Sequence, residues 1–474
     1  MNSTPPSSPP WTRTRRLRIL LAALAVAALA FSPAAVAAET AAAGTAAAET
    51  AAAETAAADQ GEATFHRDVE PILQRSCQNC HRPGAGAPMS LVSYSDTRPW
   101  ARSIARRVVN REMPPWHLDP TVGITEYVGD PSLSDQEIAT IARWVEAGAP
   151  QGDPAAAPPP AEFSPLDSWS FGEPDLVIEN EPITLPAECE DQYPNPVVET
   201  GLTEDRWIKW IQFMPGDRRV VHHSMQYAIQ EDPGLIDEEL TRTALGSGQG
   251  AMLVEYAVGN QGDYYPDGTG RLLKAGSKIR FSGHYHCIGE EATDVSSIGI
   301  KFYPKGQEPN RRVISFMLTT GVPDSERLNE LSIPPNTVAR HDRYFRLEKP
   351  AQIVTFQPHM HYLGKAMKLE IIHLDGRVET LTHVPNYDFN WQISYNYANP
   401  PVFPAGSYIH IVSWHDNTDA NRYNPDPSSW IGWGSRTVDE MGNGWVELAY
   451  MSEEEYQEHL AKAREQGGEE TGGE

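Results

Sequence analysis

Two histidines in the last third of the chain have a spacing that suits a metal site. His359 and His361 follow the apolar run 353–356, and a second run of strand-forming residues covers 367–372. On a β-strand, residues two apart project from the same face, so both imidazoles would meet one metal ion and leave room for an outside ligand. A half-buried strand with two hydrogen-bonded histidines would show the same spacing. The other candidate ligands in the chain therefore decide between these two interpretations.

Further candidate ligands occur on both sides of this pair. His222 and His223 end the predicted strand 219–221, and His284 lies on a second β-rich run. Adjacent strand residues face opposite ways, so His222 and His223 can share a metal only at a strand end or a bulge. Met441 adds a thioether downstream. Imidazole together with thioether favours copper, especially Cu(I), whereas zinc, the chemical alternative, rarely recruits methionine.

A redox motif lies near the front of the chain. Cys77, Cys80 and His81 form a Cys-x-x-Cys-His sequence. This sequence is typical of c-type haem attachment through two thioethers, with the histidine as an iron ligand. A redox-active dithiol or a chance pair of cysteines is the alternative. The adjacent histidine, an export signal and a helical setting favour haem.

The second axial ligand of this haem is expected to be Met113. It ends a helical segment at a Pro-Pro turn, which can aim its side chain at the iron. Met89 and His117 are the alternatives. Histidine–methionine ligation fills both axial positions and suits electron transfer. With this motif, most of residues 63–152 resembles the class I cytochrome c fold.

The pattern around the haem motif predicts helices. The last helical segment, 134–147, begins with a Ser-x-x-Glu capping sequence at Ser134 and ends before Gly148. Residues 153–167 are rich in proline and predict a stiff linker. The sequence thus separates a helical domain at 63–152 from the remainder of the chain.

From residue 168 the pattern changes to short β-rich runs broken by Pro, Gly, Asn and Asp. Such runs favour all-β sandwiches over a parallel sheet. The length is too great for one ordinary sandwich, so we predict two domains, at 168–330 and 331–455, followed by an acidic tail at 456–474. The aromatic residues of 385–395 are expected to lie in a sandwich core.

The N-terminus carries the features of an export signal. Residues 1–38 combine an arginine-rich start, a short apolar stretch and a small-residue cleavage site, and an Ala/Glu/Thr-rich linker follows at 39–62. We therefore expect a periplasmic or secreted protein, with an uncleaved signal anchor as the alternative. Cys189 and Cys287, the two cysteines outside the haem motif, would form a disulfide in that oxidising compartment.

The net charge of the chain limits the classes of partner that it is expected to bind. The formal net charge is −26, and loss of residues 1–38 would remove four arginines and no acids, which gives −30. Such a surface repels nucleic acid and anionic lipid, so neither is expected as a partner.

Several motifs together resemble the type II copper, ascorbate-dependent monooxygenases, the group of peptidylglycine α-hydroxylating monooxygenase and dopamine β-monooxygenase. Their order and spacing agree between about residues 202 and 450, and the preceding cytochrome motif is especially like bacterial members with a fused cytochrome domain. The matching motifs are Val221-His222-His223, His284-Tyr285, His359-x-His361 with Leu363-Gly364-Lys365, and Asp439-Glu440-Met441.

The resemblance implies two copper ions, one in each of two jelly-roll-like sandwiches facing an open cleft. His222, His223 and His284 would hold an electron-storing copper, and His359, His361 and Met441 would hold the copper that binds O2 and attacks the substrate. His286 shares a strand face with His284 and is the alternative third ligand. Tyr285 follows His284 as in the family, which favours His284.

Two positions depart from the peptide-hydroxylating members. Gln357 and Trp445 stand where those enzymes place an arginine and a tyrosine that grip a substrate carboxylate, whereas the matching Asn443 is retained. Without the cation, the charge-assisted pair that a carboxylate needs is lost. Peptidyl-glycine is therefore not the expected substrate, and Trp445 points to an apolar or aromatic one.

These features predict an exported haem–copper monooxygenase. It would hydroxylate a C–H bond of a small organic substrate with O2, using electrons from the c-type haem, from ascorbate, or from both. A periplasmic redox partner would supply electrons to the haem. The first alternative is a non-catalytic electron-transfer or copper-binding protein with a degenerate monooxygenase module. A haem peroxidase with accessory sandwiches is the second alternative, and Met113 argues against its open haem position.

Overall fold

The computed structural model describes residues 62–163, 165, 167–230, 251–257, 262–324 and 327–469. The predicted signal peptide and nearly all of the linker at 39–62 lie outside these residues, as do the last residues of the predicted acidic tail. The chain divides into two units at residue 61, and all of the described residues belong to the second unit, Glu62–Glu474. In the described part of the chain, no helix is both long and apolar enough to cross a membrane.

Short helices surround the Cys-x-x-Cys-His motif. Ser134 caps α5 through the predicted capping box, in which Ser134 and Glu137 bond each other's backbone N–H groups. Apolar side chains from these helices, including Phe65, Leu73 and Trp144, form a buried core of their own. The helices are η1 (Phe65–Val69), α2 (Glu70–Ser76), α3 (Tyr94–Thr97), η2 (Arg98–Trp100), α4 (Ala101–Val109) and α5 (Asp135–Glu146), with a short turn η3 (Pro154–Ala156) after them.

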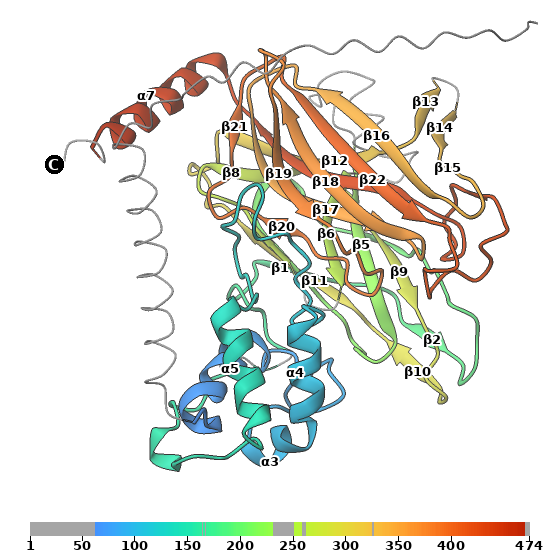
Figure 1. The fold of residues 1–474 in the computed structure, drawn as a ribbon. Helices are drawn as coiled ribbons and strands as arrows, with labels where there is room; N and C mark the ends of the chain where they lie inside the picture. Colours follow the sequence, from blue (N-terminus) through green and yellow to red (C-terminus); the bar gives the residue numbers. More distant parts are fainter. Residues whose placement is uncertain are drawn as a thin grey trace, which may run out of the picture. The chain divides into compact units, whose positions relative to one another are not determined.

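In the rest of the described chain the regular secondary structure is β-strand, apart from the short turn η3 and the C-terminal helix, as the sequence predicts (Figure 1). The earlier strands are β1 (Leu176–Glu179), β2 (Ile183–Leu185), β3 (Val197–Glu199), β4 (Arg206–Met214), β5 (Val221–Ile229), β6 (Ala251–Ala257), β7 (Gly262–Tyr264), β8 (Thr269–Leu273), β9 (Lys278–Tyr285), β10 (Ala292–Asp294) and β11 (Ser297–Phe302). The later strands are β12 (Arg311–Thr319), β13 (Val322–Asp324), β14 (Arg327–Glu330), β15 (Ser332–Ile333), β16 (Val338–Arg346), β17 (Ala351–Met360), β18 (Gly364–Ile372), β19 (Val378–Val384), β20 (Tyr395–Asn396), β21 (Val402–Phe403), β22 (Tyr408–Asp416), β23 (Ile431–Gly432) and β24 (Gly442–Tyr450). A C-terminal helix, α7 (Glu453–Glu469), comes after them.

One large sheet runs through both β regions, in the order β1-β11-β4-β8-β12-β24-β17-β20. The strands β3-β9-β5-β6 form a second sheet, and β16-β22-β18-β19 form a third. A parallel pairing of Arg311 with Thr269 and Arg312 with Gly270 joins β12 to β8, both within the predicted domain 168–330, and the large sheet continues into the second β region through β12. The strand β12 is paired along most of its length with β24 of the second region.

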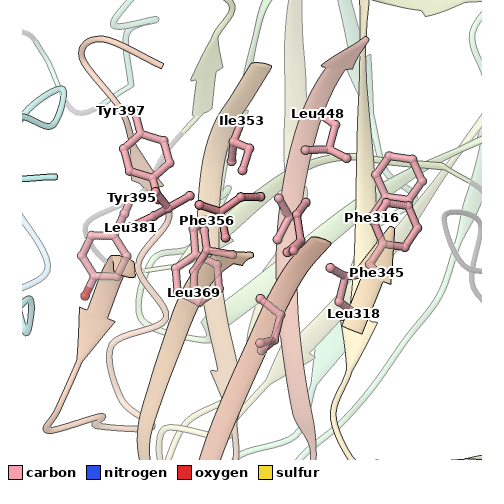
Figure 2. Packing of buried hydrophobic residues seen from close by; sticks show 14 of the residues in the cluster. Phe316, Leu318, Phe345, Ile353, Phe356, Leu369, Leu381, Tyr395, Tyr397 and Leu448 are labelled. Atoms are coloured by element: carbon pink, nitrogen blue, oxygen red, sulfur yellow. The ribbon is translucent and has the colours of Figure 1, made fainter. Parts of the chain in front are cut away.

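Each smaller sheet covers one half of the large sheet across an apolar core. Side chains such as Phe213, Tyr256 and Phe281 fill the first core. The second core contains Phe316, Phe356 and Leu448 of the large sheet together with Leu369 of the covering sheet (Figure 2). Burial of this apolar area is the main stabilising term of both sandwiches. The prediction of all-β domains is confirmed.

Candidate metal centres

A β-bulge brings His222 and His223 to the same place. On β5, His223 is paired with His284 of β9 and Val221 is paired with Tyr285, so His222 is the extra residue between them. The bulge reorients one side chain, which is how two adjacent strand residues can reach a shared ion. His222, His223 and His284 each offer a ligand atom, and these atoms all lie within 4.8 Å of one another. We call these three residues the three-histidine cluster.

The nitrogen atoms of this cluster fit a metal ion. The Nδ1 atoms of His222 and His223 lie 3.0 Å apart, and Nδ1 of His284 is buried without a hydrogen-bond partner. A buried nitrogen without a partner carries a free-energy cost that a metal ion would remove. The other nitrogen of His284, Nε2, lies 2.9 Å from Oδ2 of Asp191, a carboxylate that fixes the ring as outer-shell partners of metal ligands do.

The protonation state of the cluster also suits metal binding. Burial lowers the pKa of His222 to about 4, and the neighbouring His284 and His286 act in the same direction. Burial likewise lowers the pKa values of His223 and His284. The imidazoles are therefore neutral at neutral pH, which is the form that binds a metal. His286 is less central, since its ring centroid lies 6.3 Å from that of His222, compared with 4.9 Å for His284.

A disulfide lies beside the three-histidine cluster. Cys189 and Cys287 are bonded, with a Cα–Cα distance of 5.7 Å and a sequence separation of 98. Cys189 is two residues before Asp191, and Cys287 is three residues after His284. The bond therefore holds the Asp191 segment against the strand that carries His284.

Replacing both Cys189 and Cys287 by serine is expected to lower the free energy of unfolding by about 2–4 kcal/mol, because the closed loop is long. It should also weaken metal binding at the three-histidine cluster, since Asp191 loses its anchor. Urea unfolding and metal titration of the purified double variant measure the two effects. Unchanged metal affinity would show that Asp191 is held in place without the disulfide.

The second candidate centre is built on β17. Nδ1 of His359 donates to Oε1 of Gln392 at 2.7 Å, and Nδ1 of His361 donates to the carbonyl oxygen of Asp439 at 3.1 Å. These bonds hold each ring through Nδ1, so Nε2 would be the ligand atom of each imidazole. The two ring centroids lie 5.6 Å apart. Burial lowers the pKa of His359 to about 3, so this imidazole is also neutral.

Met441 is connected to this pair through its neighbours. Its sulfur accepts a hydrogen bond from Nδ2 of Asn443 at 3.4 Å, and Asn443 is paired directly with His359 across β24 and β17. Its carbonyl oxygen lies 3.0 Å from Nε2 of the buried His415. The thioether is thus held just before the first residue of β24, next to the strand that carries the two histidines.

A buried carboxyl group ties these two segments together, and the sequence motif did not reveal its role. Glu440 accepts hydrogen bonds from the backbone N–H groups of His361, Leu363 and Met441, the last two at 2.8 Å. Burial raises the pKa of Glu440 to about 8, while these N–H groups act in the opposite direction. Glu440 therefore positions the backbone that carries His361 and Met441.

Next to the second centre lies a layer between the two sandwiches. Trp445 is paired across the large sheet with Gln357 on one side and Met317 on the other. Trp445 and Met317 pack with Tyr227, Met225 and Met252 of the second sheet in a small apolar cluster.

One acid in this layer was not found from the sequence. Glu255 is only 2% exposed and accepts a hydrogen bond from Nε2 of Gln357, while its second oxygen has no partner. Burial raises its pKa to about 7. No local sequence signal marks Glu255, because its environment is created by strands distant in sequence.

The Cys-x-x-Cys-His segment fits covalent haem attachment. Cys77 and Cys80 are free thiols in one tight turn, in which the N–H groups of Cys80 and His81 both donate to the carbonyl of Cys77. Nδ1 of His81 lies 3.2 Å from the carbonyl oxygen of Met89, which leaves Nε2 for an iron ion. Met89, an alternative axial ligand, thus uses its backbone to orient His81.

Met113 lies in the wall of a cavity of about 670 Å3, but Cys77, Cys80 and His81 are not among the residues that line it. His117 lines the same cavity, so both the expected axial ligand and one of its alternatives face this space. The opposite wall belongs to the second sandwich and includes Tyr387 and Trp391.

The loop 385–394, which we call the aromatic loop, only partly agrees with expectation. Tyr387 and Trp391 pack against the second core as predicted. Phe389 does not belong to that core. Its ring centroid lies 6.0 Å from that of His222 and 5.8 Å from that of His361, so its ring lies next to a histidine of each candidate centre.

Comparisons with known proteins do not assign a family. No protein-family profile and no curated protein matches the chain. Solved structures that resemble it include the top component of cowpea mosaic virus, with 8% identity over 61% of this chain and 93% of that chain and a TM-score of 0.28. PNGF-II has 11% identity over 58% of this chain and 65% of that chain, with a TM-score of 0.26. A Paenibacillus xanthan lyase has 9% identity over 62% of this chain and 28% of that chain, with a TM-score of 0.17. Similarity this low supports no statement about function.

Proposed function

We propose that this chain is an exported copper-dependent monooxygenase with a fused cytochrome c domain, related to the peptidylglycine and dopamine monooxygenases. The observation that carries the proposal is the convergence of His222, His223 and His284. The resemblance names these residues as ligands of one ion, and their ligand atoms lie within 4.8 Å of one another in the fold. The disulfide Cys189–Cys287 agrees with an oxidising compartment such as the periplasm.

In this proposal each group of side chains has a defined task. The three-histidine cluster would hold one copper ion, and His359, His361 and Met441 would hold the other. When bound, the copper ions would supply the one-electron chemistry that hydroxylation of a C–H bond by O2 requires. Cys77 and Cys80 would bind the haem covalently, with His81 and Met113 as its axial ligands.

The surrounding residues orient these ligands. Gln392 and the carbonyl of Asp439 fix the two imidazoles of the second centre, and Glu440 holds the backbone around them. Trp445, which is 6% exposed, and Met317 would make the surroundings of the second centre apolar, in keeping with an apolar substrate. The chain would take electrons through its haem from a periplasmic redox partner, or from ascorbate.

Replacing Met441 by alanine is expected to abolish reduction-linked O2 uptake. It should also weaken Cu(I) binding at the second centre by at least about 10–100-fold, the range seen when residues that merely support a ligand are removed. Copper titration and oxygen-electrode measurements on periplasmically expressed protein test this expectation.

Met214→Ala serves as the control, because Met214 is a half-buried methionine of the first sandwich, at the end of β4. Uptake that is unchanged in Met441→Ala contradicts the proposed role. Two tightly bound copper ions without any O2 uptake in the unaltered chain would instead favour the non-catalytic electron-transfer protein.

A further inference from the structure

Two histidines outside both candidate centres face the interior of the second sandwich. His415 lies on the same face of β22 as Ile411, which belongs to the second core. His341 lies on the same face of β16 as Phe345, another residue of that core. His341 is paired with Ser413 on the neighbouring strand, so the two histidines are diagonal neighbours on one face of the third sheet. Their ring centroids lie 5.4 Å apart.

Each of these two rings is held by one nitrogen, while its other nitrogen is unpaired. Nε2 of His341 lies 3.0 Å from the carbonyl oxygen of Ser332, and Nε2 of His415 lies 3.0 Å from the carbonyl oxygen of Met441. A carbonyl oxygen can only accept a hydrogen bond, so Nε2 carries the proton in both rings. The two Nδ1 atoms are buried and have no hydrogen-bond partner within the protein. Each ring therefore presents a buried lone pair at Nδ1.

A metal cation is the partner that suits these two lone pairs. An unpaired buried nitrogen carries a free-energy cost, and here it arises twice. The lone pairs cannot satisfy each other, since both are acceptors, and a second proton on either ring would put a positive charge into the interior of the sandwich. An imidazole held through one nitrogen by a backbone carbonyl is a typical metal ligand, and His361 of the second centre is held in this way by Asp439.

The number of available ligands favours a cuprous ion. Among the described residues, only the three-histidine cluster brings together three or more ligand atoms of histidine, cysteine, aspartate or glutamate, so this pair has no third side chain of these types. The hydroxyl of Ser413 is already bonded to that of Thr320 at 2.6 Å. Zinc in proteins is almost always four-coordinate, whereas Cu(I) is stable with two nitrogen ligands and imidazole suits copper.

We propose that His341 and His415 form a third copper site, which binds one exchangeable cuprous ion through the two Nδ1 atoms. Two nitrogens hold copper more weakly than three, so this ion is lost together with loosely bound metal, while the two proposed centres keep theirs. The inference goes beyond the proposed function and does not depend on it, because the site uses none of the six ligands of those centres. The contact of His415 with the carbonyl of Met441 connects the third site to the second centre.

The test titrates the full-length chain with Cu(I) in the absence of O2, against a coloured chelator that competes for the ion. The unaltered chain is expected to bind one weakly held Cu(I) in addition to two tightly held ions. His341→Gln and His415→Gln each keep an N–H donor near the position of Nε2 and remove the lone pair of Nδ1. Both variants should lose the weakly held ion and keep the other two. His373→Gln makes the same change in a partly buried histidine just after β18, and it should keep all three ions.

A second measurement needs no variant, so it decides the question even if the glutamine variants fail to fold. Anomalous diffraction at the copper absorption edge, from crystals of the unaltered chain loaded with Cu(I), should show a peak about 2 Å from Nδ1 of His341 and of His415. The inference is overturned if the weakly held ion persists in both glutamine variants, or if the map shows only a water molecule at the two Nδ1 atoms.

The outcomes separate this inference from the proposed function. Two tightly held copper ions without a weakly held third ion would refute the third site and leave the monooxygenase in place. If the chain instead holds no copper tightly, but binds one Cu(I) that is lost in His341→Gln and in His415→Gln, the third site is supported and the proposed copper enzyme fails.

Discussion

Replacing His284 by alanine is expected to reduce the copper content from two ions per chain to one. His284 is buried, its Nδ1 has no partner within the protein, and its Nε2 is held by Asp191. Loss of this imidazole leaves only His222 and His223, and two neutral nitrogens hold copper much more weakly than three. Copper analysis after dialysis against a weak chelator measures the effect.

Two comparison variants sharpen this test. His459→Ala removes an exposed histidine of α7 and should leave both ions in place. His286→Ala addresses the alternative ligand and should also leave both ions, since its ring is the more distant from His222. Loss of an ion in His286→Ala, with retention in His284→Ala, would assign the third ligand to His286.

Replacing Glu447 by leucine is expected to lower the free energy of unfolding by about 3–5 kcal/mol, the usual cost of breaking a buried ion pair. Glu447 of β24 pairs with Arg271 of β8, and their side chains are only 7% and 4% exposed. Arg271 also donates to Ser315 and Tyr265, both at 2.7 Å. The variant would leave a buried cation without its carboxylate at the junction of the two halves of the large sheet.

Urea unfolding of the variant provides the measurement. Arg377→Ala is the control, because it breaks an ion pair with Glu379 whose partners are 57% and 43% exposed. An exposed ion pair contributes little to the free energy of unfolding, so this control should leave the urea midpoint of unfolding unchanged. If Glu447→Leu and the unaltered chain have equal free energies of unfolding, the ion pair does not stabilise the large sheet.

The sequence predicted the structural features that depend on the spacing of residues close together in the chain. The Ser134 cap is predicted by a four-residue pattern, and the all-β character is predicted by short runs of strand-forming residues. The condition placed on His222 and His223, a bulge or a strand end, comes from strand geometry, and the structure has a bulge there.

The features that the sequence did not reveal depend on contacts between distant strands. The parallel pairing of β8 with β12 has no local signal, because it is decided by the packing of two sandwiches. Phe389 was expected in a core because aromatic residues usually lie there, yet the direction of a loop side chain has no periodicity to indicate it. Glu255 looked like an ordinary strand residue, and only the opposing Gln357 makes it a buried carboxyl group.

The most direct measurement is the copper, zinc and haem content of the full-length protein after periplasmic expression and removal of loosely bound metal. The proposed function predicts two copper ions and one covalently bound haem per chain, with no stoichiometric zinc. One haem with no tightly bound copper, or zinc in place of copper, would contradict the copper monooxygenase. The β-sandwiches would then support an electron carrier or a zinc-binding protein.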